Sequence, residues 1–413
     1  MDESIQSRFL RGIFSTGFAR LLNLVLSLLS LMLVIRYISA EAYGAFVLIR
    51  VICIFLSEVS NFGLTLALPK YLASSETIQY KFRLINTVIY FRIFIIFLFS
   101  FLIFLVKPGL AVIFGSSPLM LSLYIYLPVL FGFVSLGRTS ISILQGLFRF
   151  KMMGIISSIS TVANFIAIII FVFVLNLSTL GLIFALIVSN SLIIILSYVA
   201  FRISDKFSIN LSILKEMLVF GLPLQVQYIL DFTFTRIDTI IIGSFLGTAG
   251  VAFYEVARKL PDSCMYLYDA FRSVFYPFIA KLYNKGEKRR LEKLLNNSNR
   301  LLAFITSLGT LIAVLFGKDI ISLLFSQEYL TSYYAFVFLM FGLNLSVLDN
   351  TLGYSLVAIG EPKKPLIVNL VRATVSSVLN LIITPIYSFT GASIVTVISN
   401  LFAVPMDLYF LRN

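Results

Sequence analysis

The sequence of 413 residues contains no histidine, no tryptophan and only two cysteines, and just 12% of its residues are charged. The absence of histidine excludes the usual zinc and haem sites and histidine-based acid–base catalysis. Cys53 and Cys264 both lie within apolar runs, so no disulfide framework is expected. In soluble domains about a quarter of the residues are charged. The shortage of charge therefore excludes an ordinary soluble fold.

Apolar residues take the place of the missing charges. They make up 59% of the chain, and its mean hydropathy is +1.00. Runs of about 20 apolar residues, each able to cross a hydrocarbon core of ~30 Å, recur along the whole sequence. The first run resembles a signal peptide because Arg8 and Arg11 precede it, but it is too long for one. We therefore predict an all-α polytopic membrane protein with twelve spans, at 12–38, 43–68, 84–106, 119–146, 153–174, 180–200, 217–245, 250–280, 296–316, 333–359, 365–386 and 390–410.

The basic residues of the loops are distributed asymmetrically. The links after odd-numbered spans contain only Lys107 and Lys318, and the even-numbered links and the termini hold the remaining basic residues of the loops. The densest cluster follows the eighth span and consists of Lys281, Lys285, Lys288, Arg289, Arg290 and Lys293. The positive-inside rule places both termini and the even-numbered links in the cytoplasm, and this topology explains the net charge of +13. Without tryptophan, the 20 tyrosines have to form the interfacial belts.

Short motifs recur about half a chain apart. The matching pairs are Ala45-Phe46 with Ala252-Phe253, Gly146 with Gly360, and Ser189-Asn190 with Ser399-Asn400. Because each half holds an even number of spans, both halves enter the membrane from the same side, so the repeat is parallel. We predict two six-helix lobes, residues 1–203 and 217–413, joined by a cytoplasmic linker at 204–216, around a central cavity. This architecture is typical of a transporter.

Many charged residues lie inside the predicted spans: Arg20, Arg50, Glu58, Arg92, Arg138, Asp231, Arg236, Asp238, Glu255, Arg258, Lys259, Asp262, Asp269, Arg272, Asp349, Arg372 and Asp407. Each costs roughly 3 kcal/mol at the centre of a lipid-facing helix, so most must face water, a partner or the other lobe. On the eighth span they form one stripe, Glu255, Arg258, Asp262, Asp269 and Arg272 with Tyr266.

These patterns predict that the second, seventh and eighth helices line a wet cavity with an excess of guanidinium groups, which suit phosphate oxygens. On the second helix Arg50 shares a face with Ser57 and Asn61, and on the seventh Asp231 and Asp238 lie on one stripe. A purely structural interpretation remains open. The charges on the eighth helix would then form intrahelical pairs, and residues near span ends would reach the headgroups.

Several motifs resemble a known family. They are residues 36–46 (RYISAEAYGAF), 62–64 (FGL), 144–147 (LQGL), 220–223 (FGLP), Asp238 with Gly243 and Gly247, and 360–363 (GEPK). In these motifs the chain resembles the polysaccharide transporters, the O-antigen flippases of the multidrug/oligosaccharidyl-lipid/polysaccharide exporter superfamily. The resemblance implies twelve helices in two lobes, alternating access and no cofactor. It also implies a polyprenyl-pyrophosphate-linked oligosaccharide as substrate, moved from the cytoplasmic to the periplasmic leaflet.

The resemblance extends to individual residues. In the related lipid II flippases, arginines on the first, second and eighth helices surround the pyrophosphate, and Arg20, Arg50 and Arg258 lie at roughly matching places. Those flippases carry two further helices that form a lipid groove, whereas this sequence predicts twelve. The match around Asp238 is closer because the surrounding motif also matches.

From these observations we predict a flippase of the bacterial inner membrane that is not an enzyme and needs no metal. The predicted substrate ligands are Arg20, Arg50, Arg138, Arg236, Arg258 and Arg272, and the predicted ion-coupling residues or counter-ions are Glu58, Asp231, Asp238 and Asp269. Other glycan-assembly proteins are expected partners.

Three alternatives remain. A cation-coupled multidrug antiporter would favour an acidic, aromatic pocket. A membrane glycosyltransferase or polymerase would need a larger external loop than the longest predicted here, 317–332. A scaffold without transport activity has little need for a charged cavity.

Overall fold

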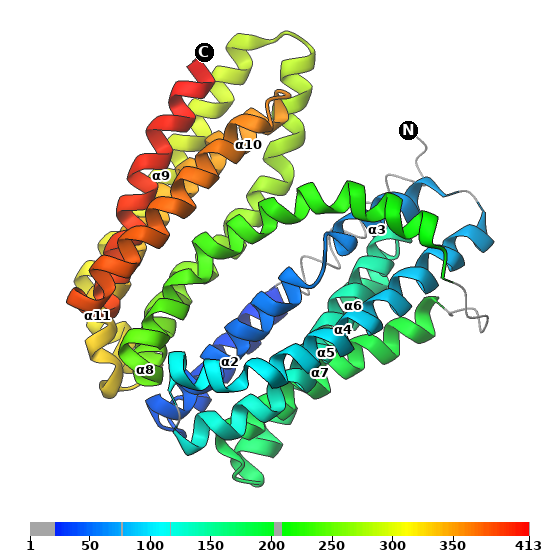
Figure 1. Cartoon of the computed structure of the whole chain (residues 1–413). Coiled ribbons are helices and arrows are strands. Elements are labelled where there is room, and N and C mark those ends of the chain that lie inside the picture. The colour runs from blue at the N-terminus through cyan, green and yellow to red at the C-terminus, as the bar shows by residue number, and fades with distance from the viewer. Residues whose placement is uncertain (1–20, 76, 116, 202–208, 413) are drawn as a thin grey trace. The chain divides into compact units, whose positions relative to one another are not determined.

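The computed structural model of this chain describes residues 21–75, 77–115, 117–201 and 209–412, and all regular structure within these ranges is helical (Figure 1). The described part of the first predicted span is a helix from Leu21 to Val34. The helices that follow are α2 (Ala40–Val59), α3 (Leu64–Ser74), α4 (Ile78–Phe114), α5 (Pro118–Gly146), α6 (Phe150–Ile168), the π-helical η1 (Ile169–Val174), α7 (Ser178–Phe201), α8 (Leu211–Asn284), α9 (Lys288–Leu324), the 3₁₀ helix η2 (Gln327–Ser332), α10 (Tyr333–Ala358) and α11 (Lys363–Arg412).

The twelve predicted spans correspond to these helices once breaks within the helices are taken into account. Helix α8 contains two spans that meet at Gly247 (φ 72°), and α11 contains two that meet at Ser388 (φ 60°). Helices α2 and α3 together form the second span, and η1 completes the span begun by α6. Each predicted span therefore corresponds to a helical segment among the residues that the structure describes.

Two predicted loops are largely helical instead. Helix α4 continues past Lys107 to Phe114, and the basic cluster at 281–293 lies on the end of α8 and the start of α9. Only a short turn around Gly286 (φ 70°) separates these two helices. Lysine and arginine are good helix formers, so a helix does not need to end where its apolar run ends.

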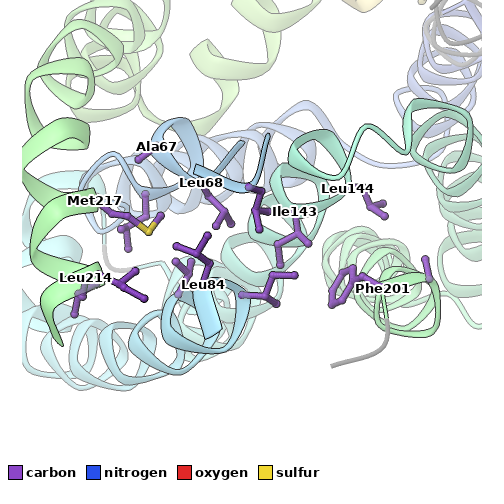
Figure 2. Close-up of a cluster of buried hydrophobic side chains, with 14 of the residues drawn as sticks. Ala67, Leu68, Leu84, Ile143, Leu144, Phe201, Leu214 and Met217 are labelled. Carbon is purple, nitrogen blue, oxygen red and sulfur yellow. The ribbon is translucent and has the colours of Figure 1, made fainter. Parts of the chain in front are cut away.

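The chain divides into two compact units, residues 1–229 and 230–413. In the N-terminal unit α5 packs against α2, α3, α4 and α7, and α6 packs against α7. Its buried core joins α3, α4 and α5 to the start of α8, which contributes Ile213, Leu214 and Met217 (Figure 2). Because lipid tails are as apolar as these side chains, close packing holds the helices together. The predicted linker at 204–216 lies partly outside the described residues, and its assignment stays a prediction.

The second span is broken between α2 and α3. Phe62 (φ 51°) and Gly63 (φ 75°) adopt left-handed backbone conformations there. The freed backbone groups are satisfied by two buried side chains. Arg92 donates to the carbonyl oxygens of Ser57 and Ser60. Gln225 accepts from the Gly63 amide at 2.9 Å and donates to the Glu58 carbonyl at 2.8 Å. A break at membrane depth persists only with such partners.

A close backbone contact explains two of the sequence motifs. Gly63 and Gly221 belong to the two Phe-Gly-Leu motifs, and a Cβ on Gly63 would lie 2.0 Å from the Gly221 oxygen. Only glycine at both positions allows the start of α8 to approach the α2–α3 break this closely.

In the C-terminal unit α10 packs against α9 and against α11. The repeat predicted from the sequence also recurs in the backbone. Phe148 (φ 56°) and Gly360 (φ 93°) end the fourth and tenth spans, and Ser178 (φ 48°) and Ser388 (φ 60°) precede the sixth and twelfth. Left-handed residues therefore terminate equivalent helices in both halves.

Candidate functional site

The N-terminal unit contains an ion pair at the crossing of α2 and α5. The Arg138 guanidinium donates to the Glu58 carboxylate, and their side chains are 41% and 15% exposed. One turn earlier on α5, Ser135 donates to the Ser57 hydroxyl at 3.1 Å. The broken second span positions Glu58, because Gln225 holds the Glu58 carbonyl oxygen just before the helix ends. The crossing therefore offers a polar surface with an accessible guanidinium group.

Positive charge dominates the helices around this pair. Between residues 42 and 201 the sequence has two acidic residues, Glu58 and Glu76, and only Glu58 lies within a predicted span. Arg50 lies two turns before Glu58 on α2 and is half-buried, with its guanidinium 5.6 Å from the centre of the Phe46 ring. Arg92 is buried and engaged by carbonyl oxygens. The unit therefore favours an anion at its accessible arginines.

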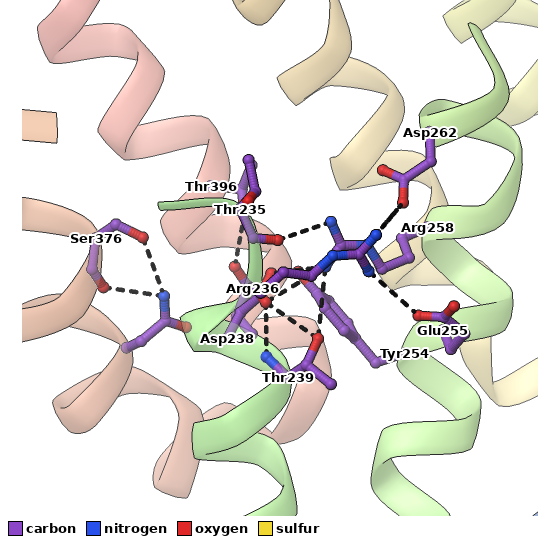
Figure 3. Close-up of polar contacts among 12 residues, drawn as sticks. Thr235, Arg236, Asp238, Thr239, Tyr254, Glu255, Arg258, Asp262, Ser376 and Thr396 are labelled. Atoms are coloured by element: carbon purple, nitrogen blue, oxygen red, sulfur yellow. Dashed lines mark hydrogen bonds and ion pairs between the residues drawn. The ribbon is translucent and has the colours of Figure 1, made fainter. Parts of the chain in front are cut away.

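In the C-terminal unit Arg258 is the centre of a buried cluster on the two halves of α8 (Figure 3). Its guanidinium donates to Asp238 at 3.3 Å, to Asp262 at 3.2 Å and to the Thr235 carbonyl oxygen at 2.9 Å. Asp238 also accepts hydrogen bonds from the Tyr254 hydroxyl and from the Thr239 amide. All three nitrogens of Arg258 are therefore occupied by protein oxygens.

Arg236 lies at the accessible edge of the same cluster (Figure 3). Its guanidinium is 3.6 Å from both the Glu255 and the Asp262 carboxylates. The Arg236 side chain is 29% exposed and that of Asp262 35%, compared with 10% for Arg258. Asp262 therefore links a buried arginine to an accessible one.

A second accessible arginine lies further along α8. Arg272 is 3.0 Å from Asp269, one turn earlier, and the two side chains are 33% and 35% exposed. Its guanidinium also donates to the Tyr354 hydroxyl and stacks on that ring at 4.4 Å. Asp231 is exposed, and its electrostatic neighbours are Arg372, Arg272 and Asp269.

The structure gathers most of the predicted site residues into pairs or clusters. Asp238, Arg258 and Arg236 lie in one cluster, Glu58 pairs with Arg138, and Asp269 pairs with Arg272. Asp269 and Arg272 form the intrahelical pair that the structural interpretation expected, whereas Glu255 approaches Arg236 on the preceding half of α8. Arg20 lies outside the described residues.

Sequence reasoning missed two groups of residues. Arg92 and Gln225, which hold the broken second span, form no periodic pattern with it. Asp349, Arg372 and Asp407 were recognised as charged residues within spans, but they lie on three separate segments, so no stripe indicated that they meet.

Comparison with known proteins gives related sequences. The profile of a family described as polysaccharide biosynthesis protein matches residues 33–334. The capsular polysaccharide biosynthesis protein CapF of Staphylococcus aureus is 25% identical over 52% of this chain and 54% of CapF. The probable low-salt glycan biosynthesis flippase Agl15 of Haloferax volcanii is 26% identical over 43% of this chain and 37% of Agl15. The matches thus span about half of CapF and less of Agl15.

Solved structures confirm the predicted fold. The lipid II flippase MurJ, in an inward closed conformation, matches with a TM-score of 0.75 and 17% identity over 97% of this chain and 87% of MurJ. An inward-facing multidrug resistance MATE family transporter of the MOP superfamily matches with a TM-score of 0.81 and 15% identity over 94% of each chain. At these identities the likeness shows the fold alone, which is polytopic and all-helical.

Proposed function

This chain belongs to the polysaccharide biosynthesis protein family, and on this basis we propose that it is a flippase for a polyprenyl-pyrophosphate-linked oligosaccharide. It moves the substrate from the cytoplasmic to the periplasmic leaflet by alternating access. It resides in the bacterial inner membrane with both termini in the cytoplasm, and it acts as a transporter and not as an enzyme.

One observation carries this proposal: an accessible arginine lies in a region of the N-terminal unit with little acid. Arg138 is 41% exposed, and Glu58 is the only acidic residue within the predicted spans between residues 42 and 201. A diphosphate carries several negative charges, and the planar guanidinium binds two of its oxygens at once. We infer that the diphosphate displaces Glu58 from Arg138 on binding, and that Arg50 and Arg20 support it.

The C-terminal unit supplies Arg236 and Arg272 to the same task. Both are paired with carboxylates yet remain about a third exposed. Arg258 is occupied by Asp238, Asp262 and a carbonyl oxygen, so its geometry supports a positioning role. Asp262 contacts both arginines. In this proposal the buried Arg258 fixes the Asp262 carboxylate, and that carboxylate orients the accessible Arg236. Asp231, Asp238, Asp269 and Glu58 remain proposed counter-ions.

The names of the relatives support a glycan substrate. CapF is named for capsular polysaccharide biosynthesis and Agl15 as a probable flippase of glycan biosynthesis. The multidrug resistance transporter among the structural matches favours the second candidate, a cation-coupled drug antiporter. The scarcity of acidic residues in the N-terminal helices argues against a cationic substrate there.

The test is transport of a fluorescent polyprenyl-pyrophosphate sugar across proteoliposomes that contain the purified protein. Arg138→Ala and Arg272→Ala should each lower the initial rate about tenfold, because a charge-assisted bond to phosphate is worth about 1.5–3 kcal/mol. Arg290→Ala is the matched control. Arg290 also pairs with an acidic residue three positions earlier, at 2.7 Å, but it lies at the start of α9 and is 77% exposed. Wild-type rates in all three variants, together with gradient-driven efflux of a cationic dye, would establish the antiporter instead.

A further inference from the structure

Three charged side chains lie buried together in the C-terminal unit. Asp349 is on α10, Arg372 is on the first half of α11, and Asp407 is on the second half. Their exposed fractions are 4%, 5% and 2%. None of them belongs to the clusters described above, and the proposed function does not use them.

Arg372 contacts one carboxylate of this group and two further side chains. It donates one hydrogen bond to the Asp349 carboxylate and another, of 2.7 Å, to the Asn369 side chain. Its guanidinium also stacks on the Phe234 ring at 3.9 Å. The Asp407 carboxyl lies against α10 one turn beyond Asp349, where a Cβ on Gly353 would be 3.4 Å from its Oδ2, and Asp349 is its acidic electrostatic neighbour. The guanidinium is therefore bonded to Asp349 and acts on Asp407 only as a nearby positive charge.

The two carboxyl groups also have incomplete hydrogen bonding. Within the described residues, Oδ1 of Asp349 and Oδ1 of Asp407 accept no hydrogen bond from any donor. The α10 residue next to Asp407 is Gly353, which has no side chain to donate. Buried oxygens of this kind require a donor that the side chains alone do not provide.

The charge of the group indicates which donor is missing. With both carboxyls ionised, the three residues would carry one excess negative charge in a buried site, and two like charges would lie in contact. A single proton between the carboxyls neutralises the group and supplies the missing hydrogen bond. Within the described residues no group of three or more His, Cys, Asp or Glu side chains is placed to hold a metal ion, and this site supplies two carboxyl groups.

Other charged groups near this site lie on α8. Asp231 interacts electrostatically with Arg372, and Asp269 and Arg272 are the further charged neighbours of Asp231. Asp231 is exposed, and Asp269 and Arg272 are paired with each other at the surface. The buried pair therefore depends on Arg372 for its charge balance.

The group lies near the end of the unit where α10 turns into α11. Asp349 is nine residues before the end of α10, and Arg372 is nine residues after the start of α11, which is about 14 Å along each helix. Asp407 is five residues before Arg412, or about 8 Å from the end of α11. Lys364 donates to the Phe410 carbonyl oxygen at 3.5 Å and ties the same end together. The three residues therefore lie within about two and a half helical turns of that end.

We propose that Asp349 and Asp407 form a proton-binding site in which one proton is shared by the two carboxyl groups beside Arg372. Release breaks the bond between the proton and a carboxyl oxygen and forms a bond to a water molecule, and the site changes from neutral to one negative charge. Rebinding reverses both changes. The site does not depend on the proposed function, whereas its role as the ion-coupling step of transport rests on that function.

Infrared spectroscopy of the reconstituted full-length protein tests the site directly. At neutral pH the wild type should show the carbonyl stretch of a protonated carboxylic acid, shifted in D₂O. Asp349→Asn and Asp407→Asn should each abolish it, because the remaining carboxylate then balances Arg372 alone. Asp269→Asn is the matched control and should keep the band, because Asp269 is paired at the surface.

A conservative variant distinguishes loss of the proton site from misfolding of the two Asn variants. Asp407→Glu keeps the carboxyl, so the band should persist at a shifted frequency. The proposal is overturned if the wild type has no such band, if the band survives in both Asn variants, or if 100-fold excess Na⁺ removes it at constant pH, since the site would then hold a cation.

The coupling role is tested separately, by lipid-linked sugar transport with and without a pH gradient. Asp407→Asn should remove the response of transport to the gradient. An unchanged response in this variant refutes the coupling role and leaves the proton site and the flippase in place. The infrared result does not depend on transport, so failure of the proposed function is distinguished from failure of the site.

Discussion

Arg92, Arg258 and Arg372 have exposed fractions of 1%, 8% and 5%, and protein oxygens occupy their guanidinium groups. Arg138, Arg236 and Arg272 have side chains that are 41%, 29% and 33% exposed, although each also pairs with a carboxylate. A buried guanidinium contributes to stability through its partners, and losing it leaves those partners uncompensated. An accessible one exchanges its partner for a ligand at little cost. Burial therefore assigns different roles to arginines that look alike in the sequence.

Arg258→Ala should destabilise the protein by about 3 kcal/mol, because it leaves the buried Asp238 carboxylate without its cation. Thermal unfolding of the protein in detergent measures the change. Arg272→Ala, at an accessible intrahelical pair, should change stability by less than about 1 kcal/mol. Equal stability of the two variants would show that the Arg258 cluster is not a structural anchor.

Glu58→Gln should strengthen the binding of inorganic pyrophosphate about two- to fivefold, because the competing carboxylate of an accessible pair is worth at most about 1 kcal/mol. Calorimetric titration of the purified protein measures this affinity. The gain should disappear in the double variant Glu58→Gln/Arg138→Ala. A gain that persists without Arg138 would contradict the proposed exchange of partners.

At the scale of elements, the break between α2 and α3 is the feature that organises the N-terminal unit. Three helices contribute to it: α4 through Arg92, α8 through Gln225 and Gly221, and the second span itself through Gly63. Because the break is closed by side chains and by a backbone contact, it holds a defined geometry instead of acting as a free hinge. It also positions Glu58 at the end of α2, opposite Arg138 on α5.

Gly63→Ala should prevent normal folding, since the new Cβ would lie 2.0 Å from the Gly221 carbonyl oxygen and the backbone has a positive φ. Size-exclusion chromatography in detergent should show aggregated or degraded protein. Gly109→Ala on α4 is the control, because its Cβ would meet no atom closer than 3.8 Å. A monodisperse Gly63→Ala protein would mean that the close approach at Gly221 is dispensable.

At the scale of the whole molecule, the chain repeats one helical plan in two units that carry different charges. The N-terminal helices have accessible arginine with little acid, whereas the C-terminal unit pairs its arginines with Asp238, Asp262, Asp269 and Asp349. The proposed substrate ligands therefore lie in both units, whereas the proposed proton site lies in the C-terminal unit, where acidic residues are available.

The proposed topology predicts on which side of the membrane the segments before and after α9 lie. In a variant without the native cysteines, an impermeant maleimide should label Glu328→Cys from the periplasmic side of spheroplasts and Lys285→Cys only after permeabilisation. Both positions are exposed on the protein, so their reactivity reports membrane side and not burial. The reverse labelling pattern would invert the proposed orientation.

Much of the fold could be predicted because a bilayer imposes a length and a composition on each span. The repeat located equivalent helix ends only approximately: it matched Gly146 with Gly360, whereas the left-handed residue after the fourth span is Phe148. The candidate site was predicted as residue types on helix stripes, but its pairs were not. Glu58 and Arg138 lie 80 positions apart, and no local pattern connects them.

The sequence by itself determined the membrane-spanning helical class, the twelve segments, the twofold repeat and the excess of arginine within the spans, because these depend on local hydrophobicity and on motifs read in order. Only the tertiary structure decided which arginine is buried and which is accessible, where Gln225 closes the broken helix, and that Asp349 and Asp407 lie near one guanidinium. These properties depend on which faces of distant helices meet, and helix packing sets them through contacts that have no period along the chain.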